Sequence, residues 1–167
     1  MNTIEYIKAS LEISMGATLP LILDLKSQPL VQPTQNGGNH AHWILGHLVY
    51  TESSVIHKLM LGKDSCPLDH LKPLFDMGTQ PCPEGTNYPA YEELLAQLEE
   101  ARAFTLSTLE TLNDDDLDKP APGCPEEWSA WFGTIGKVFN TQVIHPMMHY
   151  GQLTDIRKAL GLDPLFA

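Results

Sequence analysis

Residues 143–152 read VIHPMMHYGQ and place two histidines, His145 and His149, four positions apart. On a helix, residues i and i+4 lie on the same face with Cβ atoms about 6 Å apart, so both imidazoles can reach one ion. A third histidine, His47, lies in the earlier segment HWILGHL. If His47 comes from a facing helix, three imidazoles can hold a divalent metal and leave a coordination position open for water or substrate. That arrangement is typical of a catalytic rather than a structural metal site.

Apolar residues recur at spacings of three and four in four stretches of the chain, which predicts four helices. We expect them over about 2–27, from His40 to Leu61, from Pro89 to about Asn113, and from Trp131 or Thr134 to Leu160. In the first helix, Pro20 is expected to kink the helix or to end it near Leu19. Asn39 is the expected N-cap of the second helix. No strand or internal repeat is recognisable. The sequence therefore predicts an all-α fold, a single four-helix bundle domain over residues 1–167, whose core can hold a metal site built from facing helices.

The connections between the helices are rich in proline, glycine and polar residues. The longest spans residues 62–87 and contains four prolines. Loops of this length are uncommon in compact domains and are often functional. This one is long enough to cross the bundle, so the sequence leaves the direction of the third helix open. The acidic run 114–118 is expected to end that helix and cap the next segment rather than to bind Ca²⁺, which needs a specific ligand pattern.

Bulk composition narrows the possible partners and the compartment. The formal net charge is −11, from 21 acidic and 10 basic residues, which argues against binding to nucleic acid or to an anionic membrane. No apolar run is long enough for a transmembrane helix, and the N-terminus lacks the features of a signal peptide, so we expect a cytoplasmic protein. The three cysteines form no Cys-x-x-Cys pair and are expected to be reduced thiols.

Each candidate residue also has a simpler structural interpretation. Two histidines four apart occur by chance, but three inward imidazoles are costly in a core unless they are hydrogen-bonded or ligated. Pro146 follows His145 and cannot donate a hydrogen bond to the carbonyl of Gln142, so we expect a kink or widened turn there. The alternative is a helix that restarts at this point with His145 as its cap. The remaining histidines are interpreted as surface or capping residues: His40, His42, His57 and His70.

Four further residues are candidates for the surroundings of the site. Trp128 and Trp131 precede the last helix and either pack the end of the bundle or form a wall of a pocket for an apolar substrate. Gln152 lies near the histidine face and could hydrogen-bond an imidazole or a substrate, or simply link helices. Tyr50 lies one turn after His47 and could act in the same way.

Two segments resemble the DinB/YfiT-like family of metalloenzymes: residues 43–48, WILGHL, and residues 145–153, HPMMHYGQL, followed by Arg157 and Gly161. The resemblance extends over nearly the whole chain, with Pro146 as a departure between the paired histidines. It implies a four-helix bundle in which His47, His145 and His149 hold one zinc, nickel or iron ion. It also implies a cytoplasmic bacterial protein, often a homodimer. Better understood members are thiol-dependent S-transferases that use bacillithiol or mycothiol, and a thiol-dependent maleylpyruvate isomerase.

The leading functional hypothesis is a metal-dependent enzyme that activates a thiol or water. A thiol bound to the metal loses its proton, and the thiolate can attack an electrophilic small molecule, with a low-molecular-weight thiol as cosubstrate. A bound water would instead make the protein a hydrolase. Two alternatives remain: a non-catalytic metal-binding or stress-related bundle whose metal holds the fold, and a metal-free bundle whose histidines hydrogen-bond one another. No general base other than the metal-bound nucleophile is recognisable.

Overall fold

The computed structural model describes residues 1–165, and these contain six α-helices and no β-strand. Four helices are long: α1 (Thr3–Leu25), α2 (Ala41–Ser54), α4 (Tyr91–Glu110) and α6 (Ile135–Ala159). Two are short, α3 (Lys72–Phe75) and α5 (Ser129–Phe132), and a π-helix (Val55–Met60) continues α2 without a break. The predicted all-α fold is confirmed. None of the helices in residues 1–165 combines the length and apolar character needed to cross a membrane.

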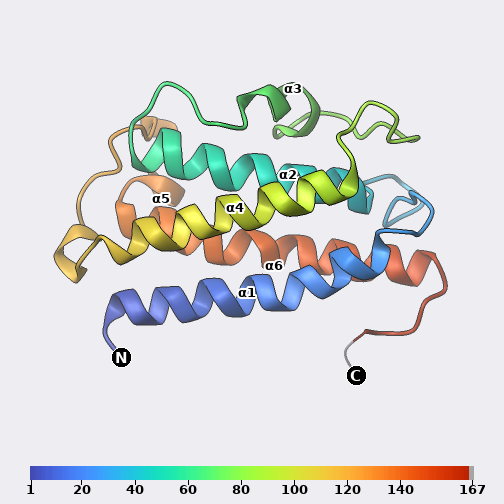
Figure 1. Cartoon of the computed structure of the whole chain (residues 1–167), viewed down its shortest axis with the longest axis horizontal. Coiled ribbons are helices and arrows are strands. Elements are labelled where there is room, and N and C mark those ends of the chain that lie inside the picture. Colours follow the sequence, from blue (N-terminus) through green and yellow to red (C-terminus); the bar gives the residue numbers. More distant parts are fainter. Residues whose placement is uncertain (166–167) are drawn as a thin grey trace.

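The four long helices lie side by side, with α1 against α6, α2 against α4, and α2 also against α6 (Figure 1). The hydroxyl of Tyr91 at the start of α4 donates to the carbonyl of Ile22 near the end of α1, 2.8 Å away. At the other end of the bundle, Lys8 pairs with Glu110. α4 is therefore antiparallel to α1 and runs in the same direction as α2, because the connection over residues 61–90 crosses the length of the bundle. This settles the direction that the sequence left open.

Two helix starts differ from the prediction, and a third agrees with one of its two predicted positions. The N-cap of α2 is His40 and not Asn39, and its Nδ1 accepts a hydrogen bond from the backbone N–H of Trp43 at 3.2 Å. α4 begins at Tyr91 with Ala90 as N-cap, so Pro89 lies before the helix instead of in its first turn. Thr134 is the N-cap of α6, which agrees with the second of the two predicted starts, Trp131 and Thr134.

Both helix-interior prolines are accommodated without ending their helices. α1 continues through Pro20 to Leu25, so the predicted end near Leu19 is wrong. α6 continues through Pro146, so the helix does not restart with His145 as its cap. The carbonyl of Pro146 accepts a hydrogen bond from the hydroxyl of Thr18 at 3.2 Å. This bond joins α1 to the histidine-bearing part of α6.

The core consists of two apolar clusters with a polar layer between them. One cluster gathers around Ile22, Leu45 and Leu153, and the other around Leu11, Ile56 and Phe139. Most of the buried polar and charged side chains of the long helices lie between these clusters: Ser14, Thr18, His47, Glu52, Ser53, Arg102, Thr105, Gln142 and His149. Arg157, near the end of α6, is also buried and pairs with Asp24.

Candidate metal centre

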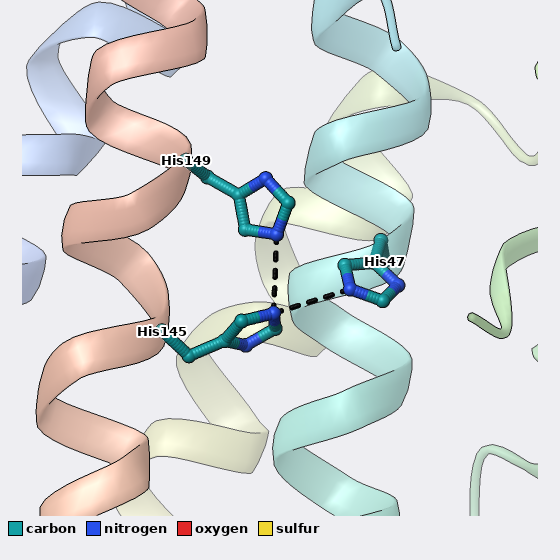
Figure 2. Close-up of side chains that lie close together, drawn as sticks. All are labelled: His47, His145 and His149. Atoms are coloured by element: carbon teal, nitrogen blue, oxygen red, sulfur yellow. Dashed lines mark hydrogen bonds between the residues drawn. The ribbon is translucent and has the colours of Figure 1, made fainter. Parts of the chain in front are cut away.

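Three histidines meet in the polar layer, between α2 and α6 (Figure 2). Nε2 of His145 lies 3.1 Å from Nε2 of His47 and 3.1 Å from Nε2 of His149. The three side chains offer nitrogen atoms that all lie within 4.8 Å of one another. His145 and His149 are brought together by their i, i+4 spacing on α6, and His47 faces them from α2. His47 and His149 are each 7% exposed, whereas His145 is partly exposed.

Each imidazole has an acceptor opposite its other nitrogen. Nδ1–H of His47 donates to the backbone carbonyl of Phe75 at 2.7 Å, and Nδ1–H of His149 donates to Oε1 of Gln152 at 2.8 Å. Nδ1 of His145 lies 3.5 Å from the hydroxyl oxygen of Thr51, whose own proton goes to the carbonyl of His47. An acceptor at Nδ1 favours the tautomer with its proton there and its lone pair on Nε2. All three Nε2 lone pairs therefore face a common point.

Burial keeps this cluster neutral. Loss of solvation, together with smaller contributions from the neighbouring His149 and His47, lowers the pKa of His145 to about 3. Burial likewise lowers the pKa of His149 to about 4, against the opposing effect of Gln152. The pKa of His47 is also lowered, chiefly by burial, although the hydrogen bond to Phe75 opposes that shift. Neutral imidazole is the form that ligates a metal.

The donor set fits a divalent transition metal better than a network of hydrogen bonds. For two Nε2 atoms 3.1 Å apart to form a hydrogen bond, one of them must carry a proton. If that proton moves from Nδ1 of the same ring, the ring loses its hydrogen bond to Phe75, Thr51 or Gln152. If it is an additional proton, the ring becomes an imidazolium, which burial disfavours. Nitrogen ligands of a tetrahedral zinc ion lie about 3.3 Å from one another, and imidazole also suits nickel and iron. The arrangement permits a metal-binding role.

Three further groups that were not predicted as part of the site surround the histidines. The indole of Trp43 stacks on the ring of His47, with centroids 4.7 Å apart and an interplanar angle of 12°. Thr51 follows His47 by four residues, and this helical spacing places it on the same face in the sequence as well. The carbonyl of Phe75 carries no such signal, because any residue has a carbonyl and position 75 lies in the long connection between α2 and α4.

The four predicted neighbours of the site have different positions. Gln152 contacts His149 directly. Tyr50 is buried, and burial raises the pKa of its hydroxyl against the opposing effect of the nearby Ser54 side chain. Trp128 and Trp131 are 42% and 59% exposed and precede α6. His145 lies ten residues into that helix, roughly 15 Å along its axis. In residues 1–165, no ring contact joins either tryptophan to a histidine.

The remaining histidines have structural roles or lie on the surface. His40 is buried and caps α2, and its Nε2–H donates to the carbonyl of Cys82 at 2.9 Å. His42 donates to the carbonyl of Pro89 at 3.0 Å, and His57 to that of Ser53 at 2.9 Å. His70 is exposed. The structure thus separates the three clustered histidines from the other four.

A search of curated proteins found no match to this chain. A family model, described as the DinB superfamily, matches residues 10–153. The matched region includes His47, His145, His149 and Gln152. The all-helical fold of residues 1–165 agrees with assignment to this superfamily. The chain therefore belongs to the DinB superfamily.

Proposed function

We propose that this protein is a divalent-metal-dependent enzyme in which His47, His145 and His149 hold the ion. One observation carries the proposal: three Nε2 atoms converge while the Nδ1 atoms behind them face the acceptors at Phe75, Gln152 and Thr51. Such partners orient the ligands and set the tautomer, and their loss typically weakens metal binding about 10–100-fold. A hydrogen-bonded cluster without metal would need no such uniform orientation.

The reaction that we propose is attack by an activated thiol or water on an electrophilic small molecule. A divalent ion with three neutral protein ligands and an open position supplies a deprotonated thiol or water at neutral pH. The chain's own residues fix the ligand tautomers, exclude most solvent from His47 and His149, and leave His145 partly exposed. Thiol S-transfer is the first reaction to test, because thiol-dependent transferases occur among the proteins that this sequence resembles. Hydrolysis is the second.

A catalytic role for the metal is favoured over a structural one by the two apolar clusters of the core. The cluster around Leu45 and the cluster around Phe139 flank the histidines on both sides. Burial of apolar surface at both ends of the bundle stabilises the fold whether or not an ion is bound. A structural metal is expected mainly where such a core is missing.

Association into a homodimer, which the resemblance implies, is likewise a proposal and is tested by light scattering.

The deciding experiment is elemental analysis of protein purified without added metal and without a chelating resin. We expect about one equivalent of zinc, nickel or iron in the parent and almost none in the His145→Ala/His149→Ala variant. His70→Ala serves as the matched control, because this histidine is exposed, and should keep the full metal content. A folded parent that holds no metal and takes up none of these ions would overturn the proposal.

The activity is then tested with the protein loaded with the metal that it retains. Low-molecular-weight thiols are paired with electrophiles in one assay series, and esters and amides are offered in a second. Thiol-dependent turnover that disappears in the double variant supports S-transfer, and turnover with water alone supports hydrolysis. If neither series shows metal-dependent turnover, the catalytic part of the proposal fails while metal binding stands.

A further inference from the structure

Gly46, the residue directly before His47, lies in the interior of α2, where glycine stabilises a helix less than alanine does. Its φ angle is not in the left-handed region, so the backbone does not require glycine there. A Cβ atom added at Gly46 would lie 2.4 Å from both Cε1 and Cζ of Phe75. By contrast, a Cβ added to the α1 glycine, Gly16, would meet nothing within 4 Å. The glycine in α2 therefore serves the close approach of the Phe75 ring.

Both the ring and the backbone carbonyl of Phe75 contact α2. Its ring is fully buried against the helix at Gly46 and contacts Tyr88, with centroids 4.7 Å apart. Its carbonyl accepts the proton on Nδ1 of His47 at 2.7 Å. Phe75 is the last residue of α3, and the backbone turns to an extended conformation at Asp76. The carbonyl is therefore one of those left free at a helix end and can accept from a side chain.

A second contact docks the same segment onto α2. Nε1–H of Trp43 donates to the hydroxyl of Thr79 at 3.1 Å, and that hydroxyl donates to the carbonyl of Leu74 at 3.1 Å. The segment 72–79 is thus held at Trp43, Gly46 and His47, three positions within two turns of one helix. Of these, only the contact at Gly46 depends on the lack of a side chain.

We propose that Gly46 is a positioning residue for the metal centre, which acts through Phe75. Without a side chain at position 46, the ring packs directly on α2 and holds its own carbonyl against Nδ1 of His47. That bond fixes the tautomer and the orientation of the His47 ring. A methyl group at position 46 displaces the ring, and the carbonyl moves with it. The inference rests on the proposed metal site, but the placement of the carbonyl can be tested without metal.

The first test compares the parent, Gly46→Ala and the matched control Gly16→Ala. Zinc affinity is measured by competition with a chromophoric chelator, at a temperature where unfolding curves show each metal-free protein to be folded. We expect zinc binding about 10–100-fold weaker for Gly46→Ala and unchanged for Gly16→Ala. In the metal-free proteins, the NMR signal of the His47 Nδ1–H should be protected from exchange in the parent and lost in Gly46→Ala. Unchanged affinity and an unchanged signal in folded Gly46→Ala would overturn the proposal.

The second test asks whether the effect passes through Phe75. Phe75→Ala removes every ring atom that the new methyl group would meet. In that background, adding Gly46→Ala should change zinc affinity less than about threefold, because no ring remains to be displaced. A further loss of about 10-fold in the double variant would show that Gly46 acts by another route, and the proposal would fail. If Gly46→Ala alone does not fold, this comparison decides; if Phe75→Ala does not fold, the first test decides.

These outcomes are distinguishable from failure of the proposed function. A parent that binds neither zinc, nickel nor iron contradicts the metal centre and not the placement of the Phe75 carbonyl. The exchange-protected Nδ1–H of His47 then remains the readout, because it is recorded in the metal-free protein. Its presence in the parent and its loss in Gly46→Ala would support the positioning role alone.

Discussion

Oε1 of Gln152 lies 2.8 Å from Nδ1 of His149, on the same helix and one turn further on. The bond leaves Nε2 of His149 as the free ligand atom, directed at His145 3.1 Å away. The backbone carbonyl of Phe75, in a different segment of the chain, accepts the Nδ1 proton of His47 and likewise leaves Nε2 of that ring as the ligand atom. Two of the three imidazoles are therefore oriented by strong acceptors, one a side chain and one a backbone carbonyl.

Replacing Gln152 by leucine should weaken zinc binding about 10–100-fold, because Nδ1–H of His149 then loses its acceptor. Gln152→Glu should keep or increase the affinity, since a carboxylate accepts the same proton and makes the imidazole more basic. Chelator competition measures both values, and circular dichroism checks that the helices are intact. Equal zinc affinity in the parent and in Gln152→Leu would show that the hydrogen bond does not support the ligand.

The metal-free protein should become less stable as the pH falls below about 6.5, the pKa of an unperturbed histidine. In the folded state the pKa of His149 is about 4 and that of His145 about 3. Between these values and the unperturbed pKa the unfolded chain binds more protons than the folded chain, so acid favours unfolding. Above the unperturbed pKa both states are neutral at these sites and the penalty vanishes.

This pH dependence is measured as the urea midpoint of chelator-treated protein between about pH 7 and pH 5. The slope should be smaller in the His145→Ala/His149→Ala variant, which lacks the two most perturbed groups. An equal slope in the two proteins would assign the acid sensitivity to other groups.

A buried ion pair joins α2 to α4 in the polar layer. Nη2 of Arg102 lies 2.9 Å from a carboxylate oxygen of Glu52, whose side chain is 3% exposed. Arg102→Ala should lower the free energy of unfolding by about 3–5 kcal/mol, because it leaves a buried carboxylate without its partner. The Glu52→Leu/Arg102→Leu variant should recover most of that loss, since neither charge is then buried. Urea denaturation of the three proteins tests this, and a double variant no more stable than Arg102→Ala would contradict it.

Sequence periodicity predicted the four long helices and the all-helical fold, because each helix buries one apolar stripe. It was less reliable at helix starts: His40 rather than Asn39 caps α2, and α4 starts after Pro89. The direction of α4 could not be predicted, since the residues of the connection over 61–90 do not specify where it runs. It follows only from tertiary contacts such as the hydrogen bond between Tyr91 and Ile22.

The clustering of His47 with His145 and His149 could be expected from spacing and from the face that each occupies. The groups that orient them were only partly accessible to the same reasoning. Thr51 follows His47 by four residues and Gln152 follows His149 by three, so helical spacing predicts that they lie near these histidines. The position of the Phe75 carbonyl instead depends on how the long connection docks onto α2. Tyr50 shows the opposite error of inference: it lies one turn after His47, yet the groups opposite the histidine Nδ1 atoms are Phe75, Gln152 and Thr51.

Removal of the metal should leave the helices folded. The apolar clusters around Ile22 and around Phe139 are complete without the histidines, so far-ultraviolet circular dichroism of chelator-treated protein should match that of the untreated protein. Zinc at about 100 times its dissociation constant should then add about 2.7 kcal/mol to the stability of the folded state. For a domain of this size that corresponds to a rise in Tm of roughly 5–10 °C. Loss of helical signal on chelation would instead assign the metal a structural role, because the binding energy would then be needed for folding.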